Sequence, residues 1–410
     1  LDPVLGLEDP FSVRVISQIF SGLLELGPEM QVLPDVAESW EVLEGGREYV
    51  FHLREDVVWS DGTPVTAEDF CYAWKRVLSP DRDIGWAYLL YDVKGASAFH
   101  QGRVSDPASV GLHAPDALTM AVELEEPCGY FLYLLASNAY PVPRHLVEAR
   151  GAAWADAESL VTNGPFRLKA WQPTESIVLE RNPMYHGRFS GNVERVEMCQ
   201  LPDPLARWAE YEADNLDVFN LSRLAPTERD RARQQHPGEQ FSVQMPVTRY
   251  IDFDVSRPPF DDVRVRRAFV LATDRHRLAD VILRGYSLPA TGGLVPPGMP
   301  GHSAGISLSY DPEQARQLLA QAGYPGGRGF PPVQALGADA IVGWREYLQA
   351  QWRENLGIDI PWEPIEWSEI MRRRDAPPHL LCTGWIADYP DPDSFMRGRL
   401  LYQDRFRDWT

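Results

Sequence analysis

The pattern of apolar and polar positions alternates along the chain between the period of a strand and that of a helix. In REYVFHLRED at 47–56, apolar residues occupy every second position, which predicts a strand with one buried face. A Ser-Asp-Gly-Thr-Pro turn follows. In the next segment, VTAEDFCYAWKRVL at 65–78, large apolar residues recur at intervals of three and four residues, as they do in an amphipathic helix. Thr66 and Asp69 have nearly the spacing of a capping box at its start, with Asp in place of the preferred Glu.

Three further segments combine helical spacing with end signals: DDVRVRRAFVLATD at 261–274, DPEQARQLLAQAG at 311–323 and IVGWREYLQAQWRENLG at 341–357. In the second of these, Asp311 is expected to cap the helix and Gly323 to close it. The third runs into IDIPWEPIEW, whose prolines predict an edge or irregular strand. Strand-like and helix-like segments therefore alternate, which indicates a mixed α/β class.

The length of 410 residues exceeds what one hydrophobic core usually organises, so two or three lobes are expected. Seams are predicted near residues 20, 145 and 247. No apolar run reaches the roughly 18 residues that a membrane-spanning helix needs. The sequence opens at LDPVLGLEDP without the pattern of a signal peptide, so a mature or trimmed chain is expected.

The net charge of −20, from 59 acidic and 39 basic residues, argues against a nucleic-acid partner, which needs a basic face. The four cysteines are far apart and show no CxxC spacing, so we expect small buried residues, with one disulfide left open. The nine histidines are scattered, without HxxxH or a His/Cys cluster. We therefore expect neither a metal site nor a cofactor.

GHSAG at 301–305 matches the nucleophile elbow of hydrolases, and the hydrolase alternative requires Ser303 to be reactive. That elbow needs a strand before the serine and a helix directly after it. Here LVPPGMP precedes the motif, and its prolines cannot donate to a sheet, while the next helix signal is only at Asp311. We expect no catalytic site.

The stretch GWIADYPDPDSF at 384–395 contains three carboxylates. Asp391 is expected to cap a helix that opens at Pro392, and Asp393 lies in its acidic first turn. Asp388 has no comparable local role. It is either a solvated loop acid or turn former, or the acid of a binding site.

Several segments together resemble one family, the extracellular solute-binding proteins (family 5) of peptide ABC transporters, of the oligopeptide- and dipeptide-binding type. The resemblance is strongest in VFHLREDVVWSDGTPVTAEDFCYAWKRV at 50–77. The other stretches that carry it are LDP at 1–3, IFSGLLE at 19–25, LPDVAESWEV at 33–42, VTNGPFRLKAW at 161–171, ERNPMYH at 180–186, RPPFDDVRVRRAF at 257–269, LAQAGYP at 319–325 and GWIADYPDP at 384–392. They cover nearly all of the chain in the family's order.

The resemblance implies a periplasmic-binding-protein-like α/β fold of the class II type, with two lobes and an extra accessory domain. Residues 1–20 and 145–246 would form lobe I, 21–144 the accessory domain and 247–410 lobe II. Short peptides would be caught between the closing lobes and delivered to an ABC transporter permease, without catalysis. We expect a monomer in the periplasm, or tethered outside the membrane, with no nucleic-acid partner.

The same resemblance implies the ligand-binding residues. Asp388 matches the aspartate that binds the α-amino group of the ligand, and a buried cation needs such a fixed opposite charge. Peptide main chain would pair with the strand Thr383, Gly384, Trp385 and Ile386, and Trp385 would also wall a side-chain pocket. Further cleft residues are expected at Leu7 and Glu8, Trp86 and Tyr88, and Ser137 and Asn138.

Two positions bear on the arginines with which some family members bind the carboxylate of the ligand. Cys382 stands where some members carry an arginine for the carboxylate of a tripeptide, whereas Arg373 matches another arginine used for ligands of other lengths. The preference for ligand length is therefore expected to be unusual. Members also continue for several tens of residues past the position of Thr410, so a fragment or a shortened module is expected.

Two alternatives stay open within this resemblance. The same fold occurs as the ligand-sensing domain of transcriptional regulators. Relatives also bind solutes other than peptides, such as metal chelates, sugars or opines.

Overall fold

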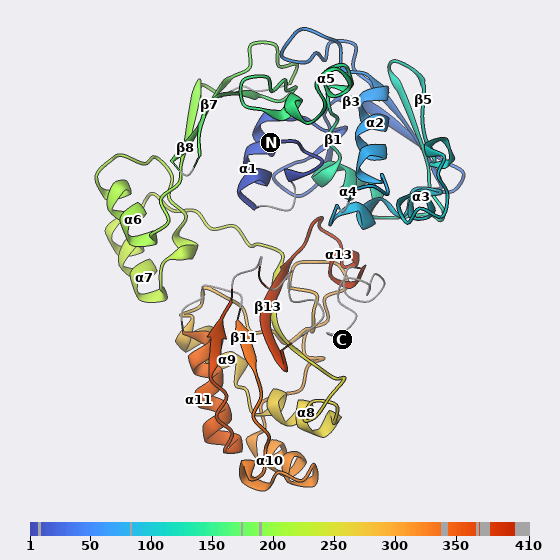
Figure 1. Ribbon diagram of the computed structural model, residues 1–410. Coiled ribbons are helices and arrows are strands. Elements are labelled where there is room, and N and C mark those ends of the chain that lie inside the picture. Colours follow the sequence, from blue (N-terminus) through green and yellow to red (C-terminus); the bar gives the residue numbers. More distant parts are fainter. Residues whose placement is uncertain are drawn as a thin grey trace. The chain divides into compact units, whose positions relative to one another are not determined.

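A computed structural model describes residues 1–6, 10–82, 84–173, 175–187, 191–337, 343–365, 369 and 378–397. The chain forms two compact units, Leu1–Leu201 and Pro202–Thr410. Each unit mixes helices and strands, as the alternating sequence pattern predicts (Figure 1). No helix among the described residues is long and apolar enough to cross a lipid bilayer.

Unit 1 contains three groups of paired strands. Its helices are α1 (Pro10–Ile19), α2 (Ala67–Val77), α3 (Ala96–His100), α4 (Phe131–Asn138) and α5 (Arg144–Arg150), with 3₁₀ turns at Ala87–Leu90, Pro107–Ser109 and Gly151–Ala155. Its strands are β1 (Leu24–Leu26), β2 (Val32–Pro34), β3 (Ala37–Leu43), β4 (Glu48–Leu53), β5 (Leu112–Asp116), β6 (Thr119–Glu123), β7 (Phe166–Gln172), β8 (Ser176–Arg181) and β9 (Arg195–Cys199). The strands pair antiparallel in the orders β1-β2, β3-β4-β6-β5 and β7-β8-β9.

Local sequence signals explain the elements of unit 1 that were predicted. In β4, every second side chain is buried, so the alternating strand predicted over 47–56 is confirmed. In α2, the carboxylate of Asp69 accepts hydrogen bonds from the Thr66 backbone N–H at 2.9 Å and from the Thr66 hydroxyl at 3.2 Å. The capping arrangement at the start of this helix is therefore confirmed as well.

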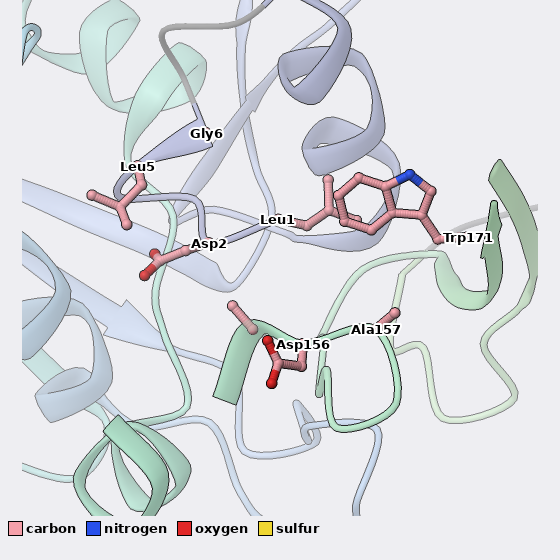
Figure 2. A pocket seen from close by; sticks show the side chains of 8 residues that line it. Leu1, Asp2, Leu5, Gly6, Asp156, Ala157 and Trp171 are labelled. Atoms are coloured by element: carbon pink, nitrogen blue, oxygen red, sulfur yellow. The ribbon is translucent and has the colours of Figure 1, made fainter. Parts of the chain in front are cut away.

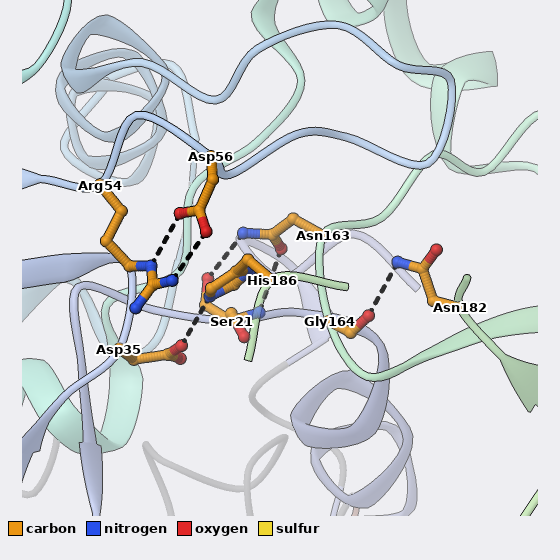
Figure 3. A network of polar contacts seen from close by, with 8 residues as sticks. All are labelled: Ser21, Asp35, Arg54, Asp56, Asn163, Gly164, Asn182 and His186. Atoms are coloured by element: carbon orange, nitrogen blue, oxygen red, sulfur yellow. Dashed lines mark hydrogen bonds and ion pairs between the residues drawn. The ribbon is translucent and has the colours of Figure 1, made fainter. Parts of the chain in front are cut away.

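A buried amide joins two distant segments of unit 1 (Figure 3). The Asn163 side chain accepts a hydrogen bond from the Ser21 N–H and donates one to the Ser21 carbonyl, both at 3.0 Å. Next to it, Gly164 donates its N–H to the Ile19 carbonyl at 2.9 Å. A Cβ on Gly164 would lie 2.6 Å from the Phe20 nitrogen, so only glycine allows this approach.

The same region holds a buried histidine beside an aspartate. His186 and Asp35, which are 151 residues apart, approach to 3.1 Å, and neither side chain is more than 9% exposed (Figure 3). Burial raises the pKa of Tyr140 to about 12, with the Asp35 charge adding to the effect. Polar contacts thus connect the segment before β3 with the segment after β8.

We predict that Asn163→Ala lowers the free energy of unfolding by about 2–4 kcal/mol, because it leaves two buried backbone groups of Ser21 without their partner. Urea unfolding followed by circular dichroism measures this change. The control is Asn215→Ala, which removes an exposed amide and is expected to stay within about 0.5 kcal/mol of the parent. A loss for Asn163→Ala no larger than the control's would contradict the role of this amide.

Unit 2 is built on a mixed sheet with helices. Its helices are α6 (Pro204–Glu212), α7 (Pro226–Gln235), α8 (Val263–Leu271), α9 (Arg275–Arg277), a π-helical turn (Leu278–Ile282), α10 (Pro312–Gln321), α11 (Trp344–Leu356) and α13 (Asp393–Met396), with 3₁₀ turns at Leu221–Arg223 and Pro325–Gly327. Its described strands are β10 (Val247–Phe253), β11 (Ala335–Gly337), β12 (Trp362–Pro364) and β13 (Leu380–Ile386), in the sheet order β10-β13-β11-β12. β10 runs antiparallel to β13, and β11 runs parallel to both β13 and β12.

The core of unit 2 lies between one face of this sheet and the helices α8, α10 and α11. Its buried members include Phe269, Leu319, Trp352, Leu380 and Cys382. The rings of Trp352 and Phe269 pack edge to face with centroids 4.9 Å apart. This packing holds the sheet and its helices together and so fixes where the carboxyl ends of β11 and β13 lie.

The helix ends of unit 2 match their sequence signals closely. The carboxylate of Asp311 accepts from the Gln314 N–H at 2.9 Å, and Gly323 has a φ of +98° after the end of α10. α11 ends at Gly357 with a φ of +70°. β12 lies at the sheet edge, as its prolines predict.

Helix α7 contacts the loop near residue 286. The ring of Tyr286 lies 4.9 Å from the guanidinium carbon of Arg229 and 4.7 Å from that of Arg233, and its hydroxyl donates to Asp230 at 2.8 Å. These contacts explain why residues 202–246 belong to the second compact unit, although the sequence-based seam lay near 247. The division of the chain into lobe I, an accessory domain and lobe II stays a prediction.

The cysteines differ in burial. Cys71, Cys128 and Cys382 are buried, as expected of small apolar residues. Cys199 is exposed at the end of β9, because the alternation of that strand turns its side chain to solvent.

Candidate ligand-binding site

The hydrogen bonds of the β10–β13 ladder show which main-chain groups of β13 remain for other partners. The Ala387 N–H donates to the Pro246 carbonyl at 2.9 Å, and the Asp254 N–H donates to the His379 carbonyl at 3.0 Å. Main-chain groups of a strand point alternately to its two sides. The odd-numbered residues of β13 therefore bond to β10, and the even-numbered ones turn their N–H and C=O groups to the opposite edge.

Along that opposite edge, the described residues of β11 pair with the first half of β13. β11 ends at Gly337, which pairs with Cys382. Among the described residues, no strand pairs with Gly384 or Ile386 on this side. Ile386 is 55% exposed. The second half of β13 thus presents two sets of main-chain donors and acceptors along an edge that begins where β11 stops.

Asp388 lies immediately beyond this open edge. The Ser394 hydroxyl accepts the Asp388 N–H at 2.8 Å, and it also accepts from Trp385 Nε1 at 3.4 Å. Ser394 itself is buried, at 3% exposure. Asp388 is half-buried. Its backbone is therefore fixed by a buried hydroxyl just beyond the end of β13.

The following turn supports this position. The Asp391 carboxylate accepts the Asp393 N–H at 2.9 Å, but α13 begins at Asp393, one residue later than the sequence suggested, and its N-cap is Pro392. Asp393 accepts from the Tyr389 hydroxyl and from Arg397 Nε, each at 2.6 Å. Asp391 and Asp393 thus hold the turn that follows Asp388.

Trp385 packs against a small apolar cluster on the other face of the sheet. That cluster comprises Val295, Met299 and Phe395, with Ala387 at its margin. The indole is partly exposed, which fits the predicted wall of a side-chain pocket. That role stays a prediction.

Cys382 lies in a different environment from the other predicted site residues. Its side chain is 1% exposed and belongs to the core beneath α8, α10 and α11. Burial raises the pKa of its thiol. Because the thiol is enclosed by apolar side chains, the structure places Cys382 in the core, and we do not include it among the contacts proposed below.

The remaining predicted residues belong to unit 1 or lie outside the described residues. Trp86 Nε1 donates to the Val4 carbonyl at 3.1 Å, and the Ser137 hydroxyl donates to the Tyr133 carbonyl at 3.0 Å near the end of α4. Tyr88 and Asn138 are half-buried. Leu7, Glu8 and Arg373 fall outside the described residues.

A pocket of about 400 Å³ opens near the first residues of unit 1 (Figure 2). Its described lining consists of Leu1, Asp2, Leu5, Gly6, Ala155, Asp156, Ala157 and Trp171, and it contains none of the predicted site residues. Asp2 is already paired with Arg76 at 2.8 Å.

Neither catalysis at Ser303 nor a metal site gains support from the geometry. Residues 283–311, all of which are described, contain no helix or strand, so GHSAG lacks the strand and helix of a nucleophile elbow. Within the described parts of the chain, no group of three or more His, Cys, Asp or Glu residues is placed to hold a metal ion.

Comparison with known proteins decides the family. The model of the bacterial extracellular solute-binding proteins, family 5 (middle region), matches residues 31–405. The chain belongs to this family.

Family 5 relatives and solved structures agree over nearly the whole chain. The probable deoxycholate-binding periplasmic protein YgiS of Escherichia coli is 33% identical, with 97% of this chain and 75% of the relative covered. The periplasmic oligopeptide-binding protein OppA of E. coli is 32% identical, with 94% and 73% covered. The crystal structure of OppAIV from Borrelia burgdorferi superposes with a TM-score of 0.87 at 29% identity, covering 100% of this chain and 81% of that one.

This chain is also similar to a solved structure that contains a bound peptide. The Haemophilus influenzae OppA complex with the peptide RPPGFSPFR has a TM-score of 0.80 to this chain at 29% identity, with 94% of this chain and 77% of that one covered. The family match and these superpositions confirm the predicted two-lobed, periplasmic-binding-protein-like α/β class.

The sequence did not identify Ser394, whose buried hydroxyl holds the backbone of Asp388. A serine inside the first turn of a helix has an ordinary local explanation, so it was not singled out.

Proposed function

We propose that this protein is the substrate-binding component of an ABC importer and that it captures short peptides with a free α-amino group. The observation that carries the proposal is the open edge of β13, which ends at the half-buried Asp388. An extended peptide can add to this edge as a further strand and bond to the main chain of Gly384 and Ile386. Such bonds do not depend on the side chains of the peptide.

Asp388 is proposed to bind the α-amino group of that peptide. A cation that leaves water for a partly enclosed site needs a fixed opposite charge. The Ser394 hydroxyl holds the Asp388 backbone, so the position of the carboxylate is set before the ligand arrives. Trp385, on the face opposite the core, is proposed to contact a ligand side chain.

The cellular setting follows from the family. We propose that the protein works outside the cytoplasmic membrane, in the periplasm or tethered to that membrane, as a monomer that delivers its ligand to a permease and does not alter it. The names of the E. coli relatives, which are periplasmic binding proteins, support this setting.

A substitution on the open edge tests the binding mode. Ile386→Pro removes a main-chain donor that points away from β10 and leaves the β10–β13 ladder intact. We expect it to weaken the binding of a peptide by about three- to tenfold, the value of one hydrogen bond, while the unfolding temperature changes little. Isothermal titration calorimetry with di- to pentapeptides measures the affinity, after native mass spectrometry has identified any ligand that co-purifies.

Ile386→Val is the matched control, because it shortens the exposed side chain and keeps the donor. Equal affinities for the Pro and Val variants would remove strand addition from the proposal. Binding of deoxycholate but of no peptide would replace the peptide by a carboxylate-bearing amphiphile, as the name of YgiS suggests for that relative.

A further inference from the structure

The Ser394 hydroxyl accepts hydrogen bonds from two residues at the end of β13. The Asp388 N–H donates to it at 2.8 Å, and Trp385 Nε1 donates to it at 3.4 Å. Ser394 is 3% exposed, so this oxygen lies inside the protein. The two donors belong to the residues that are proposed above to bind the amino group and a side chain of the ligand. One buried oxygen therefore joins the two proposed contacts.

The backbone of Ser394 is fixed by α13 and the turn before it. Its N–H donates to the Asp391 carbonyl at 3.1 Å. On one side, the carboxylate of Asp393 accepts from the Tyr389 hydroxyl at 2.6 Å. On the other side, Phe395 is fully buried. The Ser394 side chain thus extends from a well-held turn toward the end of β13.

Apolar packing connects α13 with the indole of Trp385 a second time. Phe395 forms a buried cluster with Val295 and Met299, and Trp385 packs against this cluster. The indole is therefore held at its ring by the cluster and at its nitrogen by the Ser394 hydroxyl. The bond to the hydroxyl is long, at 3.4 Å, so a ligand side chain that presses on the indole can strengthen it.

Sharing one oxygen makes the two proposed contacts depend on each other. A hydroxyl oxygen has two lone pairs and can accept both hydrogen bonds at once. Residues in one hydrogen-bond network do not contribute independently to a free energy. A ligand side chain that fixes the indole also fixes the hydroxyl, and through it the backbone of Asp388. Less freedom then has to be lost when the amino group binds.

We infer that Ser394 is a positioning residue that couples recognition of the ligand's amino group at Asp388 to recognition of a ligand side chain at Trp385. This inference rests on the proposed function, because both contacts belong to it. A peptide with a large side chain against Trp385 then gains more from its free amino group than a peptide of small residues does. The site selects for the two features together, although main-chain pairing is independent of side chains.

The test measures what acetylation of the amino group costs, with and without a large side chain on the peptide. Tri-alanine and its versions with phenylalanine at the first, second or third position are titrated by calorimetry, each as the free amine and N-acetylated. In the parent, acetylation is expected to weaken one of the phenylalanine peptides about three- to tenfold more than tri-alanine. Ser394→Ala removes the acceptor and Trp385→Phe the donor of the 3.4 Å bond, so in both variants this extra factor should fall to about one.

The controls separate positioning from folding. If Ser394 only stabilised the fold, Ser394→Ala would weaken free and acetylated peptides alike and the extra factor would persist. Ser394→Thr keeps the hydroxyl and should restore the extra factor, whereas Ser309→Ala removes an exposed hydroxyl of the same unit and should change nothing. Thermal unfolding shows which variants are folded, and Trp385→Phe tests the same bond from β13 should Ser394→Ala not fold.

The outcomes distinguish this inference from the proposed function. The same cost of acetylation for tri-alanine and for every phenylalanine peptide in the parent would overturn the coupling and leave both contacts intact. An extra factor that persists in either Ser394→Ala or Trp385→Phe would overturn the role of Ser394. If acetylation costs nothing for any peptide, the proposed amine site at Asp388 is wrong, and the coupling with it.

Discussion

Asp388→Asn is expected to weaken the binding of peptides with a free amino group by about 30- to 150-fold, which corresponds to about 2–3 kcal/mol. The variant keeps the size of the side chain and replaces a full negative charge by a neutral amide. The expected loss lies at the lower end for a buried charge pair, because Asp388 is half-buried and solvent screens part of the interaction.

The measurement is calorimetry with matched pairs of free and N-acetylated peptides. An acetylated peptide carries no charge at its amino end, so the parent and the variant should bind it with similar affinity. Glu363→Gln is the control for net charge, because it removes one exposed acid of the same unit from β12. If Glu363→Gln weakens binding as much as Asp388→Asn does, the effect is one of overall charge and Asp388 has no specific role.

Trp352→Ala is expected to lower the free energy of unfolding of unit 2 by about 3–5 kcal/mol. This side chain is 1% exposed and packs against Phe269 and Trp362, with ring centroids 4.9 Å and 5.9 Å away. Its Nε1 also donates to the Thr273 hydroxyl at 3.0 Å. The substitution therefore opens a cavity and removes a buried hydrogen bond together.

Differential scanning calorimetry measures the loss. Trp352→Phe fills most of the cavity and removes the hydrogen bond, so it should cost about 1–2 kcal/mol. The ratio between the two variants separates packing from hydrogen bonding. Equal losses for the two variants would show that the ring volume of Trp352 does not stabilise the core.

Much of the secondary structure was predictable because its causes are local. The cap at Asp311, the closing glycine of α11 and the capping box of α2 each depend on residues a few positions apart. The same holds for Asp391, whose carboxylate accepts a hydrogen bond from a backbone group two residues away. Such contacts form in the same way wherever the helix is placed in the fold.

The candidate site was predictable only in part. The sequence assigned no capping role to Asp388, and together with the family resemblance this pointed to residues 383–388. Among the described residues they lie at the end of β13, where no other strand pairs with Gly384 or Ile386 on the side away from β10. The same resemblance placed Cys382 in the site, whereas its side chain lies in the core. A sequence position does not reveal which face of a strand carries the core, since that depends on the register with neighbouring strands.

The sequence by itself determined the family, the α/β class and the local ends of the helices, because these depend on patterns and contacts within short segments. Only the tertiary structure decided that β11 pairs with β13 as far as Cys382 and that, in the described part of the chain, no strand pairs with Gly384 or Ile386 on that side. The physical reason is that strand pairing and core packing join residues about a hundred positions apart, and no local pattern encodes such a pairing.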